Sequence, residues 1–158
     1  MRLMIQQRVF ALTDTYDIYD EYGNPKYIVN TEFLRLGHHM HIYDMYNQEV
    51  GVIRQDIFHW FPVFEVEIGG QTIGRIQKRF SMFTPKYDIE YRGWQVRGDF
   101  LGWNYDVYDG GYCIAYISKE LFNWGDTYVI DIANPANEIL GLMLVLAIDA
   151  ANCGLSLI

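Results

Sequence analysis

The chain has 158 residues, a length typical of one domain, and 51% of them are hydrophobic, which is enough for a large buried core. The formal net charge of -8 disfavours nucleic-acid binding, because an acidic protein repels phosphate backbones. The two cysteines, Cys113 and Cys153, belong to no Cys-x-x-Cys motif, so we interpret them as reduced thiols of a cytosolic protein.

The N-terminal segment Met1–Arg8 carries positive charge but lacks the apolar stretch of a secretory signal peptide. We therefore expect a cytoplasmic location for the protein, either free or peripheral to a membrane.

From Tyr16 to Ile132 the sequence repeats short alternating apolar segments that are separated by turn residues. Gly69-Gly70 and Asp109-Gly110 are strong hairpin signals, because such residues accept the positive φ angles of primed turns. The central apolar residue of one strand in each unit recurs at regular intervals: Ile18, Ile42, Val66, Ile89, Val107 and Ile130. This pattern predicts a meander of antiparallel hairpins with about twelve strands.

A sheet of so many strands tends to curl because its twist accumulates, and closure removes its exposed edges. We therefore predict a mainly β fold over residues 1–158: a single domain formed by a closed antiparallel β-barrel of about twelve strands.

A helix is predicted over about residues 135–152, in the core of this barrel. Asn134 is a suitable N-cap, and Pro135 suits the first helical position. The run Ile139–Ile148 is apolar on every face, so either lipid or protein must surround it. Because the run has ten residues and a membrane span needs ~20, we favour protein and predict no transmembrane span.

Four motifs extend over nearly the whole chain: Tyr16-Asp-Ile-Tyr-Asp20, Ile42-Tyr-Asp-x-x-x-x-Glu-Val-Gly51, Gly74-Arg-Ile-x-Lys78, and a final segment from Ile132-Ala-x-Pro to Leu144-Val-Leu-Ala-Ile-Asp149. Together they resemble the LURP-one-related family, including its small bacterial members. That resemblance implies a tubby-like barrel closed around a central C-terminal helix.

The resemblance implies no catalytic residue and no cofactor, because the family has no established biochemical activity. We therefore expect a non-enzymatic binding or regulatory module, whose partner is an anionic phospholipid headgroup or a protein. Tubby proteins bind phosphoinositides and phospholipid scramblases share the barrel, so anionic-phospholipid binding or scramblase-like membrane association is one alternative. An enzyme with an unrecognised site at a barrel mouth is the other, although a barrel filled by its own helix leaves little room for substrate.

One segment between residues 75 and 97 is basic in this acidic chain, with only Asp88 and Glu90 opposing its cations. On adjacent hairpins these cations could form a patch for anionic headgroups. The alternative is a solvated strand face whose charges block edge pairing. The candidate residues are Arg75, Lys78, Arg79, Lys86, Arg92 and Arg97.

Apolar residues in predicted loops provide a second candidate surface. Phe80, Met82 and Phe83 could enter a membrane interface beside the basic segment. Other aromatic residues in predicted loops either cover a barrel end or form a contact patch, namely Trp60, Phe61, Phe122 and Trp124.

Histidines and carboxylates give weaker signals. His39 and His41 share one strand face, but two imidazoles fall short of the three or four ligands of a zinc site, and we predict no metal. Asp20 and Asp44, each after a tyrosine, are expected to accept hydrogen bonds from turn N–H groups rather than to act in catalysis.

Overall fold

The computed structural model describes residues 1–8, 15–34, 37–79, 86–99, 102–122 and 125–153. Period-2 alternation of apolar side chains forms strands along most of this length, and the unbroken apolar run near residue 140 forms the helix. The elements are β1 (Arg2–Arg8), β2 (Thr15–Asp20), β3 (Pro25–Leu34), β4 (Gly37–Asp44), β5 (Glu49–Asp56), β6 (Val63–Ile68), β7 (Gln71–Arg79), β8 (Lys86–Tyr91), β9 (Gln95–Asp99), β10 (Asn104–Asp109), β11 (Tyr112–Phe122), β12 (Gly125–Ile132), the 3-10 turn η1 (Pro135–Asn137) and α1 (Glu138–Cys153).

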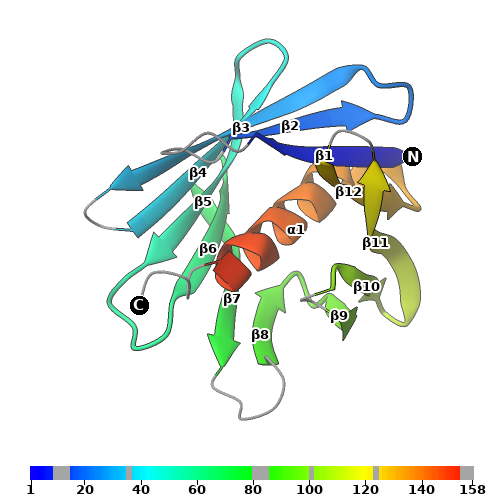
Figure 1. The fold of residues 1–158 in the computed structure, drawn as a ribbon. Coiled ribbons are helices and arrows are strands. Elements are labelled where there is room, and N and C mark those ends of the chain that lie inside the picture. The colour runs from blue at the N-terminus through cyan, green and yellow to red at the C-terminus, as the bar shows by residue number, and fades with distance from the viewer. Residues whose placement is uncertain (9–14, 35–36, 80–85, 100–101, 123–124, 154–158) are drawn as a thin grey trace.

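The strands form one 12-stranded antiparallel sheet in the order β8-β7-β6-β5-β4-β3-β2-β1-β12-β11-β10-β9. The sheet curls around α1, which runs through its centre (Figure 1). The predicted fold class, a mainly β barrel of about twelve antiparallel strands with a helix inside, is confirmed.

Two details of the barrel differ from the prediction. Met1–Arg8 was not recognised as a strand, yet β1 lies between β2 and β12 and joins the two ends of the meander. Full closure was predicted, but β8 and β9 are the two edges of the sheet and do not pair in the described residues. The barrel is therefore nearly closed.

The inner face of the sheet carries the apolar residues that alternate along each strand. Ile18, Ile42, Val66 and Ile130 are fully buried, as their recurrence in the sequence predicted. They pack with the helix in one hydrophobic core, to which the half-buried Ile89 also contributes.

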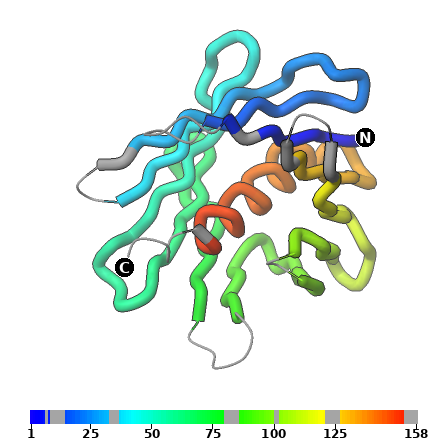
Figure 2. Tube along the Cα trace, in the orientation of Figure 1, coloured from blue at the N-terminus to red at the C-terminus, as the bar shows by residue number. Residues whose placement is uncertain are grey.

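The helix occupies the centre of that core, as its Cα trace shows (Figure 2). Every residue from Leu142 to Ile148 is at most 1% exposed, which confirms that protein surrounds the apolar run. Asn134 accepts a hydrogen bond from the Ala136 N–H at 3.0 Å and caps the start of η1. Among the described residues, no helix is both long and apolar enough to cross a membrane.

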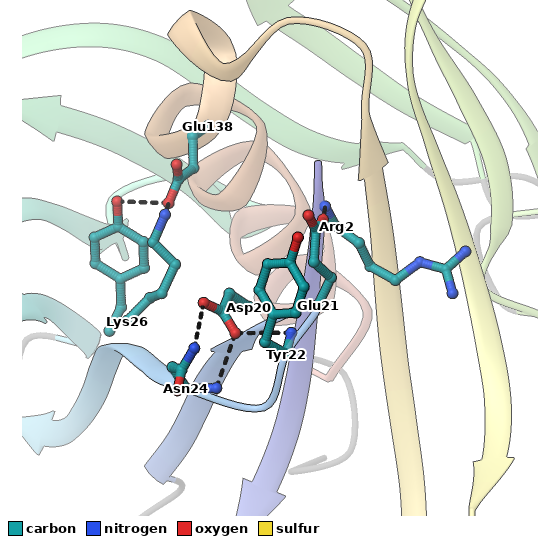
Figure 3. A network of polar contacts seen from close by, with 8 residues as sticks. Arg2, Asp20, Glu21, Tyr22, Asn24, Lys26 and Glu138 are labelled. Atoms are coloured by element: carbon teal, nitrogen blue, oxygen red, sulfur yellow. Dashed lines mark hydrogen bonds and ion pairs between the residues drawn. The ribbon is translucent and has the colours of Figure 1, made fainter.

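Polar contacts fix both ends of the helix to the barrel wall. At its start, the Glu138 carboxylate lies 2.5 Å from the Lys26 ammonium and accepts a hydrogen bond from the Tyr27 hydroxyl at 3.0 Å (Figure 3). Near its end, the buried Asp149 carboxylate accepts a hydrogen bond from the Tyr16 hydroxyl at 2.7 Å. These contacts set the position of α1 along the barrel axis.

Candidate functional site

The main interruption of the barrel wall is the seam, which we define as the space between β8 and β9. The two strands follow one another in the chain and are joined by the turn Tyr91–Trp94, which the Trp94 N–H closes by donating to the Tyr91 carbonyl at 2.8 Å. Beyond this turn the strands diverge, and no ladder joins them in the described residues (Figure 1).

A cleft of about 560 Å³ occupies the seam. Its apolar lining comes from Trp94 in the turn and from inner-face residues of β8 and β9, and its charged lining comes from outer-face residues of β7, β8 and β9. The lining residues are Arg79, Lys86, Tyr87, Asp88, Ile89, Trp94, Gln95, Val96 and Arg97. The cleft therefore brings together three cations and one carboxylate from three strands, β7, β8 and β9.

The three cations of the cleft differ in their contacts. The Arg79 guanidinium forms an ion pair with Asp88 across the β7–β8 ladder. Arg97 donates a hydrogen bond to the Gln95 side chain at 2.8 Å and lies 5.0 Å from the centre of the Tyr108 ring. Lys86 is exposed at the start of β8. Because these contacts are exposed, each contributes at most about 1 kcal/mol.

The other predicted basic residues lie elsewhere. Arg75 is 2.7 Å from the Glu65 carboxylate, which lies directly opposite it on β6, so this cation is held in a cross-strand ion pair. Lys78 lies two residues after the buried Ile76, on the same face of β7. Its side chain is half-buried at one end of the inner face. Arg92 is exposed in the turn Tyr91–Trp94 with a φ of 53°. The structure thus gathers three of the six candidates at one cleft.

An exposed aromatic loop lies on the same side of the barrel. The aromatic loop comprises residues 57–62 between β5 and β6, and Phe58 and Trp60 are 89% and 95% exposed. Asp56 accepts a hydrogen bond from the Phe58 N–H at 3.0 Å and orders the start of the loop. Trp60 therefore does not cover the barrel end and remains available as a contact patch.

A second, smaller cleft connects the aromatic loop to the seam. It has a volume of about 160 Å³ and is lined by His59, Val63, Arg75, Gln77, Asp88 and Glu90. Because Asp88 also lines the seam cleft, the two clefts meet at this carboxylate. Phe80, Met82, Phe83 and Trp124 lie outside the described residues.

The opposite end of the barrel carries different hairpin tips. Tyr22 and Tyr46 are 82% and 87% exposed there, near the start of α1. Asp20 accepts hydrogen bonds from the backbone N–H groups of Tyr22 and Asn24 at 2.9 and 2.8 Å, and Asp44 holds its own turn in the same way. Donation from Asn24 lowers the pKa of Asp20. The predicted turn role of Asp20 and Asp44 is confirmed.

A further shallow cleft of about 510 Å³ lies beside the N-terminus. Its charged lining consists of Arg2, Glu21 and Asp131, and Cys113 also borders it. The Arg2 guanidinium donates to both Asp131 carboxylate oxygens, at 2.7 and 2.9 Å, and its backbone N–H donates to Glu21 at 2.8 Å. Arg2 and Asp131 are thus engaged with each other, which makes this cleft a weaker candidate than the seam.

His39 and His41 are neighbours on the outer face of β4, whereas His59 lies in the loop between β5 and β6. His41 is 2.7 Å from the Glu49 carboxylate, and His59 is 3.2 Å from that of Asp56. Partial burial lowers the pKa of His39, which stacks edge-on against His41. Within the described part of the chain, no group of three or more histidine, cysteine or acidic side chains is placed to hold a metal ion.

Sequence reasoning missed the buried polar contact inside the barrel. Asp149 is 6% exposed on the helix, and its hydrogen bond from Tyr16 joins residues 133 positions apart. Burial, with the charge of Asp149 as a smaller cause, raises the pKa of Tyr105. The signal was a carboxylate at the end of a wholly apolar helical run, which requires a partner when it is buried.

Comparisons with known proteins give one family model, one related protein and one similar structure. The model of the LURP-one-related family matches residues 1–149. An uncharacterised protein of Bacillus subtilis (strain 168), YxjI, is 26% identical over 149 residues, which cover 94% of this chain and 92% of that protein. The X-ray structure of an Arabidopsis thaliana protein superposes with a TM-score of 0.60 at 15% identity, covering 94% of this chain and 90% of that one. At this identity the second likeness concerns the fold alone.

Proposed function

The chain belongs to the LURP-one-related family, and from that premise we propose that it acts by binding rather than by catalysis, with membranes that carry anionic phospholipids as its ligand. The observation that carries this proposal is the exposed pair Phe58 and Trp60 on the side of the barrel that also holds the seam cations. A non-enzymatic role fits an interior filled by α1, which leaves little space for a substrate.

Exposed aromatic side chains favour a membrane interface. Tryptophan and phenylalanine gain by leaving water for the boundary between headgroups and acyl chains. A Trp side chain that is 95% exposed in water buries almost none of its apolar surface in the free protein. The aromatic loop therefore has apolar surface available for a lipid contact.

The neighbouring cations provide the electrostatic half of the contact. Clustered lysine and arginine residues gain about 1 kcal/mol each near an anionic membrane surface. Lys86 and Arg97 make no ion pair among the described residues, whereas Arg79 would have to share its contact with Asp88. Because the net charge of the whole chain is -8, the remaining faces are repelled, which favours one orientation on the membrane.

Vesicle co-sedimentation tests the proposal. We expect binding to phosphatidylcholine vesicles that contain phosphatidylserine or a phosphoinositide, and none to phosphatidylcholine alone. The double variant Phe58→Ser/Trp60→Ser should lose most of this binding. Tyr22→Ser/Tyr46→Ser removes two equally exposed rings at the opposite end and is the matched control.

A charge reversal tests the electrostatic part. Lys86→Glu should weaken binding to anionic vesicles about tenfold, whereas Lys119→Glu makes the same change of charge on β11, outside the basic segment, and should have little effect. Absence of vesicle binding by the unmodified protein at low salt would refute the proposal.

A further inference from the structure

The turn between β8 and β9 has the form that normally joins paired strands. Its two central residues, Arg92 and Gly93, have φ angles of 53° and 73°, as a type I′ hairpin turn requires. Gly69 and Gly70 have φ angles of 58° and 75°, and that turn leads directly into the β6–β7 ladder. The backbone at Tyr91–Trp94 therefore has the conformation of a hairpin turn, but the strands on either side of it, β8 and β9, are not paired in the described residues.

The register that this turn defines can be continued along both strands. Successive residues on either side of the turn would then face each other, inner face with inner face and outer face with outer face. The resulting cross-strand pairs are Glu90 with Gln95, Ile89 with Val96, Asp88 with Arg97, Tyr87 with Gly98 and Lys86 with Asp99.

These pairs are chemically complementary. Asp88 with Arg97 and Lys86 with Asp99 would place opposite charges across from each other on the outer face, and Ile89 with Val96 would pack apolar groups on the inner face. Tyr87 would cover Gly98, as Tyr91 already covers Gly74 in the β7–β8 ladder. A slip of one residue would lose the opposite-charge pairs, so the match is specific to the register of the turn.

While the seam is open, Asp88 and Arg97 contact residues on neighbouring strands instead of each other. Asp88 pairs with Arg79 on β7, and Arg97 lies over the Tyr108 ring on β10. Each edge strand is thus held toward the strand behind it, away from the seam. These exposed contacts are weak, so the open arrangement and a paired arrangement differ by small contributions.

We propose that the seam is a two-state element that closes by pairing β8 with β9, and that an anionic surface binds the open state in preference. Closure would set Arg97 against Asp88 and Lys86 against Asp99. Because Asp88 then leaves Arg79, the number of seam cations without a carboxylate partner among the described residues falls from two to one. Opening frees Lys86 and Arg97 again and returns Asp88 to Arg79. This inference rests on the proposed function, because the ligand that favours the open state is the anionic membrane.

The coupling follows from linkage. A ligand shifts an equilibrium between two states only by its difference in affinity for them. An anionic membrane that contacts Lys86 and Arg97 in the open seam has such a difference, so membrane binding opens the seam and a closed seam weakens binding by the same factor.

A disulfide across the seam tests both statements. In a background with Cys113→Ser and Cys153→Ser, the double variant Glu90→Cys/Gln95→Cys places two thiols at a pair without backbone hydrogen bonds, where a closed hairpin brings the Cβ atoms close enough for a disulfide. We expect rapid disulfide formation under mild oxidation. The oxidised protein should bind phosphatidylserine vesicles at least about tenfold more weakly than its reduced form.

Each result has one meaning. Failure to form the intramolecular disulfide in folded protein overturns closure. Disulfide formation with unchanged vesicle binding overturns the coupling to the membrane. If even the unmodified protein binds no vesicles, the proposed function and the coupling fail together, while closure is judged by disulfide formation alone.

A charge reversal supplies an independent readout of closure. Arg97→Asp would oppose Asp88 across a closed seam and should slow disulfide formation severalfold. Adding Asp88→Arg restores the opposite-charge pair and should restore the rate. An equal rate in all three proteins would show that the cross-strand charges do not guide closure.

Discussion

The hairpins β6–β7 and β8–β9 begin with the same kind of turn and end differently. Both turns have two central residues with positive φ, yet β6 and β7 are paired along their length, whereas β8 and β9 separate after Trp94. A turn therefore determines where the chain reverses, but contacts elsewhere decide whether the strands that follow stay together.

The contacts of the two hairpins explain the difference. Arg75 of β7 reaches Glu65 of β6, so the ion pair lies within that hairpin. In the second case Asp88 and Arg97 make contacts outside their own hairpin, with β7 and β10. The helix also holds β8, because the Tyr91 hydroxyl donates to the Leu140 carbonyl at 2.7 Å and the Tyr87 hydroxyl donates to Asn152.

The largest effect is expected from a substitution in α1, the helix that supports both hairpins. Leu144 is fully buried on α1, and Leu144→Asp would bury an unpaired charge against the inner face of the sheet. We expect a loss of more than about 4 kcal/mol in the free energy of unfolding, which leaves the domain unfolded. Circular dichroism and thermal melting measure this.

The control for the helix is Ala136→Asp, an exposed change in η1 before the helix, where negative charge is tolerated. It should leave the melting temperature nearly unchanged. A Leu144→Asp protein that melts like the unmodified chain would contradict the central position of the helix.

An intermediate effect is expected at the boundary between the paired strands and the seam. A Cβ at Gly74 would lie 2.4 Å from the Tyr91 ring and 2.9 Å from the Glu90 carbonyl oxygen, so β8 itself must move. Gly74→Ala should cost about 1–3 kcal/mol of stability in urea unfolding.

Gly51→Ala is the matched substitution on β5. Its Cβ would also have a 2.4 Å contact, but with the flexible end of Met143, which can adopt another rotamer. We expect a smaller loss of stability than at Gly74. Equal losses would indicate that β8 yields as easily as a methionine side chain.

The smallest effect is expected from alanine substitutions in the turns of the two hairpins, which allow a direct comparison. Gly70 and Gly93 have φ angles of 75° and 73°, and a Cβ at either position would meet nothing within 4 Å. Alanine at such an angle costs about 1 kcal/mol where the turn is enforced. We expect this cost for Gly70→Ala and less for Gly93→Ala, because the unpaired seam lets its turn relax.

Urea unfolding of both turn variants measures the difference. Equal losses of stability would mean that β8 and β9 are mostly paired in solution. When the oxidised Glu90→Cys/Gln95→Cys pair holds the seam closed, the loss of stability caused by Gly93→Ala should rise toward that caused by Gly70→Ala.

Much of the fold was predictable because its signals are local. The alternation around Ile18, Ile42 and Val66 specifies the inner face, and the apolar faces of Ile139–Ile148 specify a surrounded helix. The turn roles of Asp20 and Asp44 follow from the ability of a short carboxylate to accept nearby N–H groups.

The rest depends on contacts between distant residues. β1 was missed because Leu3 and Ile5 supply only two buried apolar positions, and its pairing with β12 is not visible in the sequence. Clustering of charges along the chain did not reveal that Arg75, Lys78 and Arg92 do not line the seam cleft. Nor does it show which cations find a carboxylate on a neighbouring strand.

The position of β1 has a consequence for how the chain folds. β1 pairs with β12, and the Met1 amino group donates to the Ile132 carbonyl across 131 positions of sequence. During synthesis, β1 can pair with β2 early, but its other edge waits for β12, which emerges more than a hundred residues later, and the core remains empty until α1 follows. Such late contacts between distant residues slow folding, and the nascent sheet exposes its apolar inner face for most of translation.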